Sequence, residues 1–186
     1  DEPIDFRITR DDIPTYSVSA AYMATDSTGY IKVTLFGETT PFEIRTAVGK
    51  LKRQGMKHLI LDLEDNGGGY LQAATEIAGM FLNQDEMIVY TEGSHAEPAR
   101  YYNTSPGNKD IDRLVVTVNQ FSASASEILS GAVQDQDRGV VVGRRTFGKG
   151  LVQRPFPFPD GSMIRLTTAR YYTPAGRCIQ KPYTPG

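Results

Sequence analysis

The chain has 186 residues, of which 39% are hydrophobic, enough to bury the core of one domain without a metal or disulfide staple. Its 20 basic and 22 acidic residues give a net charge of −2, which excludes a disordered acidic tail and disfavours nucleic acid as a partner. Cys178 is the only cysteine and His58 and His95 are the only histidines, so we expect no metal and no cofactor. No run approaches the roughly 18 to 20 apolar residues of a membrane span, so we expect no direct span.

Residues 1–28 are predicted to be a connector that carries one edge strand. Phe6-Arg7-Ile8-Thr9-Arg10 alternates between apolar and polar residues, and a small, polar run leads from Ile13-Pro14 to Gly29. The pattern sharpens at Tyr30, from which an alternating strand runs to Phe36. We therefore expect the folded core to occupy residues 29–186.

A helix is predicted after this strand. Thr40-Pro41-Phe42-Glu43 has the form of a capping box with proline at the first helical position. Apolar residues then recur with the spacing of one buried helical face, and Gly55 offers a stop. That face consists of Ile44, Ala47, Val48 and Leu51.

Strands and helices alternate through the rest of the chain. The predicted elements are a strand at His58–Leu63, a helix from Leu71 to Phe81, a strand at Met87–Tyr90, a polar loop over 92–110, a strand at Leu114–Val118, a helix at Ala125–Val133 and a strand at Val140–Val142. At the end, Leu151–Phe158 and Ser162–Thr168 flank Asp160-Gly161 and predict an antiparallel hairpin. This order predicts an α/β fold with a mainly parallel central sheet, helices on both faces, and ligands at the carboxyl ends of the strands.

Gly143–Gly150 matches the phosphate-binding pattern G-x-x-x-x-G-K up to its last position. Gly150 stands where that pattern needs a Ser or Thr to ligate magnesium, and a Pro-rich, strand-like segment follows instead of a helix. Nucleotide binding is therefore disfavoured.

A serine cluster, Ser122-Ala123-Ser124-Ala125-Ser126-Glu127, lies where a predicted strand meets a helix. A serine there would be displayed at the carboxyl edge of the sheet beside free backbone N–H groups, which suits a nucleophile. Ser124-x-x-Glu127 also has the form of a capping box, so a purely structural helix cap is the alternative.

An activated serine needs a base, and with histidine scarce Lys149 is the obvious substitute. Lysine has an ordinary pKa of about 10.4, and lowering it by about 3 units costs about 4 kcal/mol, which burial without a carboxylate partner would supply. We expect Phe147, Leu151 and Val152 to provide that burial. The alternatives are a solvated surface lysine, or His58 or His95 as the base.

Two further positions complete a candidate site. Gln153, four residues past Lys149, could orient the amine with a neutral amide that does not raise its pKa as a carboxylate would. Asn66-Gly67-Gly68-Gly69 lies at a strand-to-helix junction and could aim N–H groups at an oxyanion. An exposed strand glutamine and a plain tight turn are the respective alternatives.

Together, Asp62–Gly69, Asn119–Glu127 and Thr146–Gln153 resemble the C-terminal processing peptidases, the tail-specific proteases of family S41, and the resemblance covers roughly residues 30–175. It implies a crotonase/ClpP-like core within residues 29–186 and a serine endopeptidase that cleaves proteins near their C-termini. The site residues that it implies are Ser124 as nucleophile, Lys149 as general base, Gln153 as the orienting residue, and the N–H groups of Ala125 and one turn glycine, Gly69 rather than Gly68, as oxyanion hole.

The resemblance also implies protein or peptide substrates with exposed C-terminal tails, an upstream PDZ domain, and a place outside the cytoplasm, in the periplasm or cell envelope. The oligomeric state is left open. One departure is Gly67, where related sequences commonly have proline. Two other classes stay open: a catalytically inactive peptide-binding or scaffold domain of the same fold, and a crotonase-like acyl-CoA enzyme, because strand-turn-helix oxyanion holes also serve thioesters.

Overall fold

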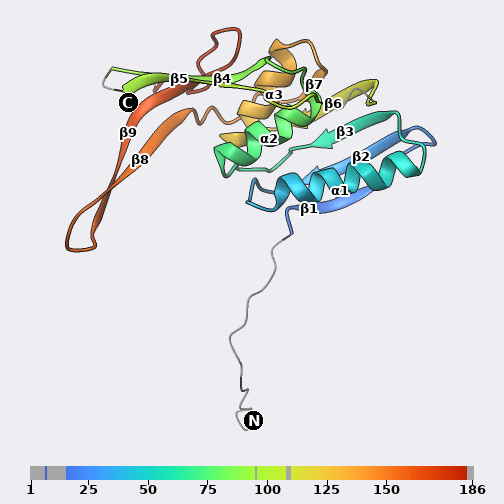
Figure 1. Cartoon of the computed structure of the whole chain (residues 1–186), viewed down its shortest axis with the longest axis horizontal. Coiled ribbons are helices and arrows are strands. Elements are labelled where there is room, and N and C mark those ends of the chain that lie inside the picture. Colours follow the sequence, from blue (N-terminus) through green and yellow to red (C-terminus); the bar gives the residue numbers. More distant parts are fainter. Residues whose placement is uncertain (1–6, 8–15, 95, 108–109, 184–186) are drawn as a thin grey trace.

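The computed structural model describes residues 7, 16–94, 96–107 and 110–183. All of the predicted edge strand at Phe6–Arg10 except Arg7 lies outside these residues, as does His95. The described part contains nine strands in two sheets and three helices (Figure 1). In chain order they are β1 (Val18–Met23), β2 (Thr28–Val33), α1 (Thr40–Arg53), β3 (His58–Asp62), α2 (Leu71–Phe81), β4 (Met87–Gly93), β5 (Ala96–Tyr102), β6 (Arg113–Val118), α3 (Ala125–Asp135), β7 (Val140–Gly143), β8 (Leu151–Pro157) and β9 (Met163–Tyr172).

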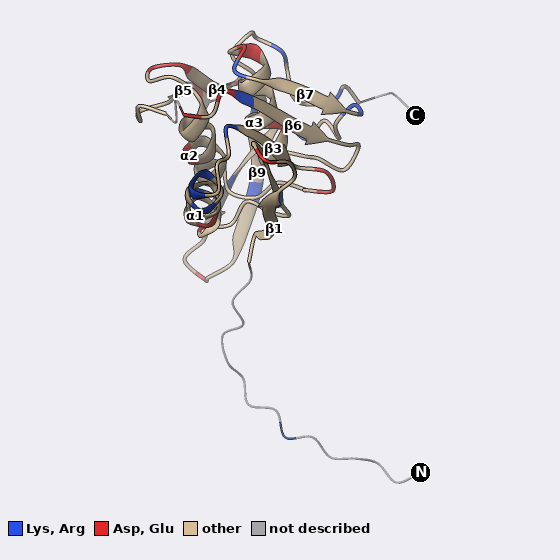
Figure 2. Cartoon of the chain, turned by 90° about the vertical axis from the view of Figure 1, so that its right-hand side faces the viewer, with Lys and Arg blue, Asp and Glu red and all other residues tan. Residues whose placement is uncertain are grey.

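The larger sheet has the strand order β1-β2-β3-β6-β7, in which β1 is antiparallel to β2 and the other neighbours are parallel. The parallel strands follow one another in a single direction across the sheet. Because crossovers between parallel strands are right-handed, this order puts α1, α2 and α3 on the same face (Figure 2). The α/β class with flanking helices is confirmed.

The prediction that helices cover both faces of this sheet is wrong for the described residues. Ile31, Leu61 and Val116 on the helix-facing side are fully buried, whereas the alternate residues Ile60 and Val115 are only half-buried. The continuous apolar runs of β3 and β6 suggested a strand buried on two sides, but the connections place every described helix on one side.

β1 and the start of α1 also differ from the prediction. Instead of a connector, Val18–Met23 forms a strand whose Tyr22 pairs with Tyr30, with ring centroids 5.0 Å apart. The capping box predicted for α1 does not form, because the Glu43 carboxylate accepts the N–H groups of Ser17 and Val18, at 2.8 and 2.9 Å. That carboxylate therefore anchors the start of β1.

The C-terminal end of α1 is as the sequence predicts. The helix ends at Arg53, and Gly55 follows with φ +98°, a backbone conformation that favours glycine. The Met56 N–H returns to the Leu51 carbonyl, at 3.1 Å, which closes the last turn in the manner of a Schellman motif.

The second sheet is antiparallel with the order β5-β4-β9-β8. It corrects the prediction of a polar loop over 92–110, because β4 extends to Gly93 and Ala96–Tyr102 forms β5. β5 is polar because it is an edge strand with mostly exposed side chains. β8 and β9 pair antiparallel around Asp160-Gly161 and extend from the body as an arm (Figure 1).

One hydrophobic core joins these layers. α2 and α3 pack against each other and against β4, so they lie between the two sheets. Fully buried members include Leu59 and Leu61 of β3, Ile77 of α2 and Leu129 of α3. No helix in the described ranges is long and apolar enough to cross a membrane. The arrangement brings the carboxyl ends of β3 and β6 and the N-termini of α2 and α3 to one edge.

Candidate active site

Ser124 lies at this edge, directly before α3, and is half-buried. Its backbone has φ 55° and ψ −111°, a conformation that is costly for a residue with a side chain and persists only where the surroundings enforce it. The neighbours supply that enforcement: the Ala123 N–H and the Ser126 hydroxyl donate to the Asn66 carbonyl, at 3.0 and 2.8 Å. The serine segment is thus fixed against the turn that follows β3.

Two glycines of that turn are required by their surroundings. A Cβ atom on Gly68, which has φ +99°, would lie 2.8 Å from the Ser124 Cβ and 2.9 Å from the Ala125 nitrogen. A Cβ atom on Gly69, with φ +148°, would lie 2.2 Å from the Phe36 carbonyl oxygen. A Cβ atom on Gly67 would have no atom within 4 Å, so this glycine is not required by its surroundings. The turn therefore touches the nucleophile segment through Gly68.

The backbone N–H groups of the site divide into occupied and available donors. The Gly68 N–H donates to the Asn66 side-chain oxygen, at 2.9 Å, while the Asn66 amide group donates to the Val33 carbonyl. Within the part of the chain that the structure describes, the N–H groups of Gly69 and Ala125 have no acceptor. An incoming oxygen can therefore be bound by Gly69 and Ala125, but not by Gly68 without breaking its bond to Asn66.

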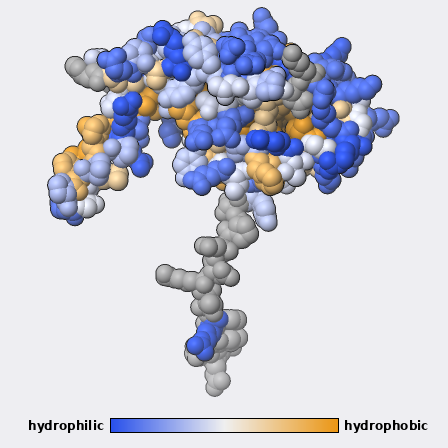
Figure 3. All heavy atoms as spheres, in the orientation of Figure 1, coloured by the Kyte–Doolittle hydropathy of each residue, from blue (hydrophilic) through white to orange (hydrophobic). Residues whose placement is uncertain are grey.

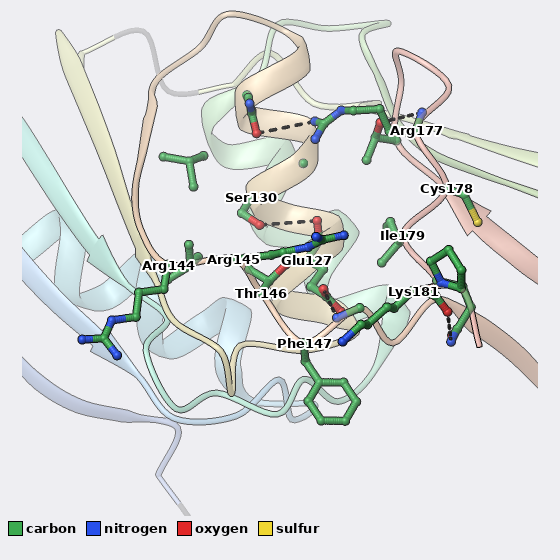
Figure 4. A pocket seen from close by; sticks show the side chains of 18 residues that line it. Glu127, Ser130, Arg144, Arg145, Thr146, Phe147, Arg177, Cys178, Ile179 and Lys181 are labelled. Carbon is green, nitrogen blue, oxygen red and sulfur yellow. Dashed lines mark hydrogen bonds between the residues drawn. The ribbon is translucent and has the colours of Figure 1, made fainter. Parts of the chain in front are cut away.

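A buried carboxylate joins the serine to residues 144–150, the segment between β7 and β8 that carries Lys149 and is called the lysine loop below. Glu127 is 5% exposed and accepts the N–H groups of Ser124, Gly148 and Lys149, at 2.9, 2.6 and 2.8 Å. Figure 4 draws Glu127 with its bond to Gly148. The sequence pattern assigns Glu127 only a capping role, and its position three residues after Ser124 is the one signal that marks it. The structure gives it a larger one, because it holds the backbones of both candidate catalytic residues.

The lysine loop is held from its other side by the C-terminal segment. The Lys181 N–H donates to the Gly148 carbonyl, at 2.9 Å, and the Gly150 N–H donates to the Gln180 side-chain oxygen, also at 2.9 Å. The backbone around Lys149 is therefore fixed between α3 and residues 180–181.

The burial predicted for the Lys149 side chain is not found. Lys149 is exposed, Phe147 is 56% exposed, and Leu151 and Val152 are only half-buried. The physical reason is that the lysine loop leads directly into β8, an edge strand of the arm, where no described residue covers it. No hydrogen bond among the described residues joins the Lys149 amine to the Ser124 hydroxyl.

Gln153 is exposed as well. It lies on β8 opposite Thr167, beside a bulge in the β8–β9 ladder, and makes no hydrogen bond to Lys149. The structure thus brings together the backbones of Ser124 and Lys149 with the glycine turn, and leaves the side chains of Lys149 and Gln153 in solvent.

The histidine alternative does not fit the fold as far as it is described. His58 begins β3, a strand of five residues that spans about 16 Å, whereas Ser124 lies beyond its carboxyl end. His58 is therefore at the wrong end of the sheet to act as the base. The phosphate-loop alternative fails too, because the Gly148 and Lys149 N–H groups are bound to Glu127.

Asp62, at the end of β3, is a buried residue whose contacts the sequence does not reveal. Its carboxylate accepts the Tyr30 hydroxyl at 2.5 Å, the Lys32 amine at 2.9 Å, the Thr117 hydroxyl at 2.8 Å and the Glu64 N–H at 2.8 Å. Burial alone would raise the pKa of Asp62, but these hydrogen bonds outweigh it and lower the pKa below its ordinary value. Burial and the bond to Asp62 raise the pKa of Tyr30. The cluster ties β2, β3 and β6 together just before the glycine turn.

Comparisons with known proteins agree with the motifs. The model of peptidase family S41 matches residues 27–185. A carboxyl-terminal-processing protease of Picosynechococcus sp. is 41% identical over 180 residues, which cover 94% of this chain and 42% of that protein. A chloroplastic C-terminal processing peptidase of Tetradesmus obliquus is 39% identical over 156 residues, covering 82% of this chain and 33% of that protein.

A solved structure of a photosystem II D1 C-terminal processing protease superposes with a TM-score of 0.77 at 36% identity, covering 88% of this chain and 43% of that one. The resemblance drawn from the three motifs is confirmed by these matches. The chain spans 42% or less of the length of both relatives described above.

Proposed function

The chain belongs to peptidase family S41, and on that premise we propose that it is the catalytic core of a serine endopeptidase that cleaves proteins near their C-termini. The observation that supports the proposal is the Glu127 carboxylate, which accepts the N–H groups of both Ser124 and Lys149 and so holds the backbones of these two residues together. The core would have the crotonase/ClpP-like form over residues 29–186.

In this proposal Ser124 is the nucleophile and Lys149 the general base. Neutral Lys149 removes the hydroxyl proton, the alkoxide attacks a peptide carbonyl, and the ammonium returns the proton to the departing amine. Water then hydrolyses the acyl-enzyme. The available N–H groups of Gly69 and Ala125 support their role as the oxyanion hole, where each donor contributes about 2.7 to 4 kcal/mol to transition-state stabilisation.

The exposed lysine side chain defines what must change for catalysis. The Lys149 backbone is already bonded to Glu127, so in this proposal it is the exposed side chain that turns toward Ser124. Covering the amine then keeps it neutral, and Gln153, on the same segment, orients it. Catalytic contacts are often loose until substrate binds, so we take the observed state as the resting one.

The test compares variants of the 186-residue chain on an unfolded protein with an apolar C-terminal tail. Ser124→Ala and Lys149→Arg, which keeps the positive charge but cannot supply a neutral base, should each lower turnover by at least about 10³-fold, with unchanged circular dichroism. Full turnover by either variant rejects the assignment.

The inactive scaffold is the second candidate, and the exposure of Lys149 is the observation in its favour. It requires tail-peptide binding without any turnover in the unaltered chain. Membership of a peptidase family speaks against both this and the acyl-CoA alternative. An upstream PDZ domain, substrates with exposed tails and a place in the periplasm or cell envelope remain part of the proposal, because they rest on the family alone.

A further inference from the structure

A cavity of about 360 Å³ lies behind the lysine loop, and neither Ser124 nor Lys149 lines it. Its walls are α3, the loop over residues 144–148 and the C-terminal segment over residues 177–182 (Figure 4). Glu127 and Gly148 form the wall that it shares with the candidate active site. The cavity is thus separate from the reacting groups but in contact with the residues that position them.

Four cationic residues line this cavity, and two of them, the exposed Arg145 and Lys181, face it from opposite walls. Figure 4 shows the Arg145 side chain crossing over α3 and the Lys181 side chain reaching back from the C-terminal segment, both toward the region beside Glu127. Arg144 also belongs to the lining, but Figure 4 shows its side chain pointing away from Glu127. Ser130 and Thr146 add hydroxyl groups to the lining. The cavity therefore offers donors of both the charged and the neutral kind.

The carboxylates around the cavity are already engaged. The Glu127 carboxylate binds three backbone N–H groups, and Asp135 forms an ion pair with Arg177 and accepts the Ala175 N–H. Burial alone would raise the pKa of Asp135, but these bonds, with one from Thr173, lower it, so the residue stays charged beside Arg177. In the described ranges, neither Arg145 nor Lys181 has an ion-pair partner.

We propose that this cavity is a binding site for an oxyanion, a carboxylate or phosphate group, which bridges Arg145 and Lys181. Such a ligand supplies the negatively charged partner that Arg145 and Lys181 lack, because the Glu127 and Asp135 carboxylates are bonded to other groups, and both cation types bind oxyanions well. Because Arg145 belongs to the lysine loop and Lys181 to the segment bonded to Gly148, the bridge joins the two sides between which the Lys149 backbone is held. Occupancy therefore stabilises the loop that carries the base.

The first experiment measures binding of inorganic phosphate to the 186-residue chain by calorimetry and thermal shift, with ionic strength held constant by chloride. Phosphate should bind and raise the Tm of the unaltered chain. Arg145→Gln and Lys181→Gln should each weaken binding at least tenfold, and Arg145→Lys, which restores the charge, should recover most of it. Arg144→Gln is the matched control and should bind like the unaltered chain. Equal binding by all variants, or no binding at tens of millimolar phosphate, overturns the proposal.

A second experiment separates two sources of the oxyanion, a free anion and the terminal carboxylate of a substrate tail. It uses Ser124→Ala, which cannot cleave, with one tail peptide prepared as the free acid and as the C-terminal amide. Tighter binding of the free acid, with competition from phosphate and dependence on Arg145, identifies the tail as the ligand. Equal binding of both peptides together with Arg145-dependent phosphate binding identifies a free anion.

The effect on turnover rests on the proposed function, whereas binding does not. Phosphate should raise kcat of the unaltered chain several-fold, and should leave kcat of Arg145→Gln unchanged. If the chain proves inactive but binds phosphate through Arg145, the proposed function fails and the anion site stands. If the chain cleaves substrate but the Arg145 and Lys181 variants bind phosphate as the unaltered chain does, the proposed anion site is wrong and the proposed function is unaffected.

Discussion

Glu127 accepts hydrogen bonds from two segments of the chain that meet only in the folded protein. Its oxygens bind the N–H of Ser124 in its own turn and those of Gly148 and Lys149, 21 and 22 residues further on. A carboxylate suits this position because it has only acceptors, and all three partners are donors. A single residue thus sets the relative position of the Ser124 and Lys149 backbones, the proposed nucleophile and base.

Glu127→Gln should loosen the connection between the Ser124 segment and the Gly148–Lys149 segment, because glutamine has nearly the same shape as glutamate but lacks one of its two acceptor oxygens. The amide nitrogen of glutamine would face an N–H donor, so at least one bond is lost and a buried donor is left unpaired, at a cost of about 1–3 kcal/mol in the free energy of unfolding. Displacement of the lysine should lower kcat by roughly 10²-fold. Ser130→Ala, which removes one weak bond of 3.4 Å to the Glu127 carbonyl, is the control. Unchanged kcat in Glu127→Gln would contradict the positioning role.

A second prediction concerns the glycine turn, where a glycine-to-alanine substitution adds one methyl group. Gly68→Ala places a carbon against Ser124 and Ala125, so it should destabilise the chain by about 1–3 kcal/mol and reduce turnover. Gly67→Ala meets no atom within 4 Å and should leave stability unchanged or raise it by about 0.4–1 kcal/mol. Urea unfolding and turnover of the two variants test this, and equal effects would show that the turn does not press on the serine segment.

At the scale of elements, three parallel strands are joined at their carboxyl ends by polar side chains. Asp62 of β3 accepts bonds from Tyr30 and Lys32 of β2 and from Thr117 of β6, directly before the glycine turn. These bonds lie where the turn must be held still. The strands therefore support the glycine turn, which carries one of the proposed oxyanion donors, through one buried carboxylate.

The lowered pKa of Asp62 makes this junction sensitive to acid. Because the folded-state pKa is below the unfolded value of about 3.9, the stabilisation is present above that value and is lost as the pH falls through the folded pKa. We expect the free energy of unfolding to fall below about pH 4, and to fall less steeply in Asp62→Asn. Asp135 has a lowered pKa too, so some slope should remain in the variant. If the free energy of unfolding fell equally steeply with pH in Asp62→Asn and in the unaltered chain, Asp62 would not contribute to the acid sensitivity.

At the scale of the whole molecule, the described residues form two sheets with α2 and α3 between them and an arm that extends from the body. The arm is rich in exposed apolar side chains, visible as orange atoms on the extension in Figure 3. They are Phe156, Phe158, Met163, Ile164 and Leu166, each between 44% and 57% exposed. β8 is also an edge strand, which makes the arm the part of the molecule most prone to pair with another copy.

Two prolines limit that pairing. Pro155 and Pro157 lie on alternate positions of β8, opposite Arg165 and Met163, and remove two N–H donors from its outer edge. The double variant Pro155→Val, Pro157→Val should restore those donors and promote association, measured as a rise in mass by light scattering over a concentration series. Pro159→Ala, in the turn at the tip, is the control. A double variant with the same mass as the unaltered chain at every concentration would refute this role of the prolines.

Local patterns in the sequence determined much of this protein. The apolar stripe of α1, its end at Gly55, the apolar runs of β3 and β6 and the glycine turn each follow from residues close together in the chain. The three motifs also predicted the family correctly, because each is a short segment of residues close together in the chain.

Only the tertiary structure decided which segments meet. β1 and β5 have weak patterns of their own and become strands because β2 and β4 offer them edges. Glu43 binds the start of β1, more than 20 residues away, rather than its own helix end. Lys149 is exposed because burial depends on what packs over β8, and neighbouring residues cannot specify that. In each case the stabilising free energy comes from contacts between residues that are distant in the sequence. The local sequence pattern therefore does not predict them.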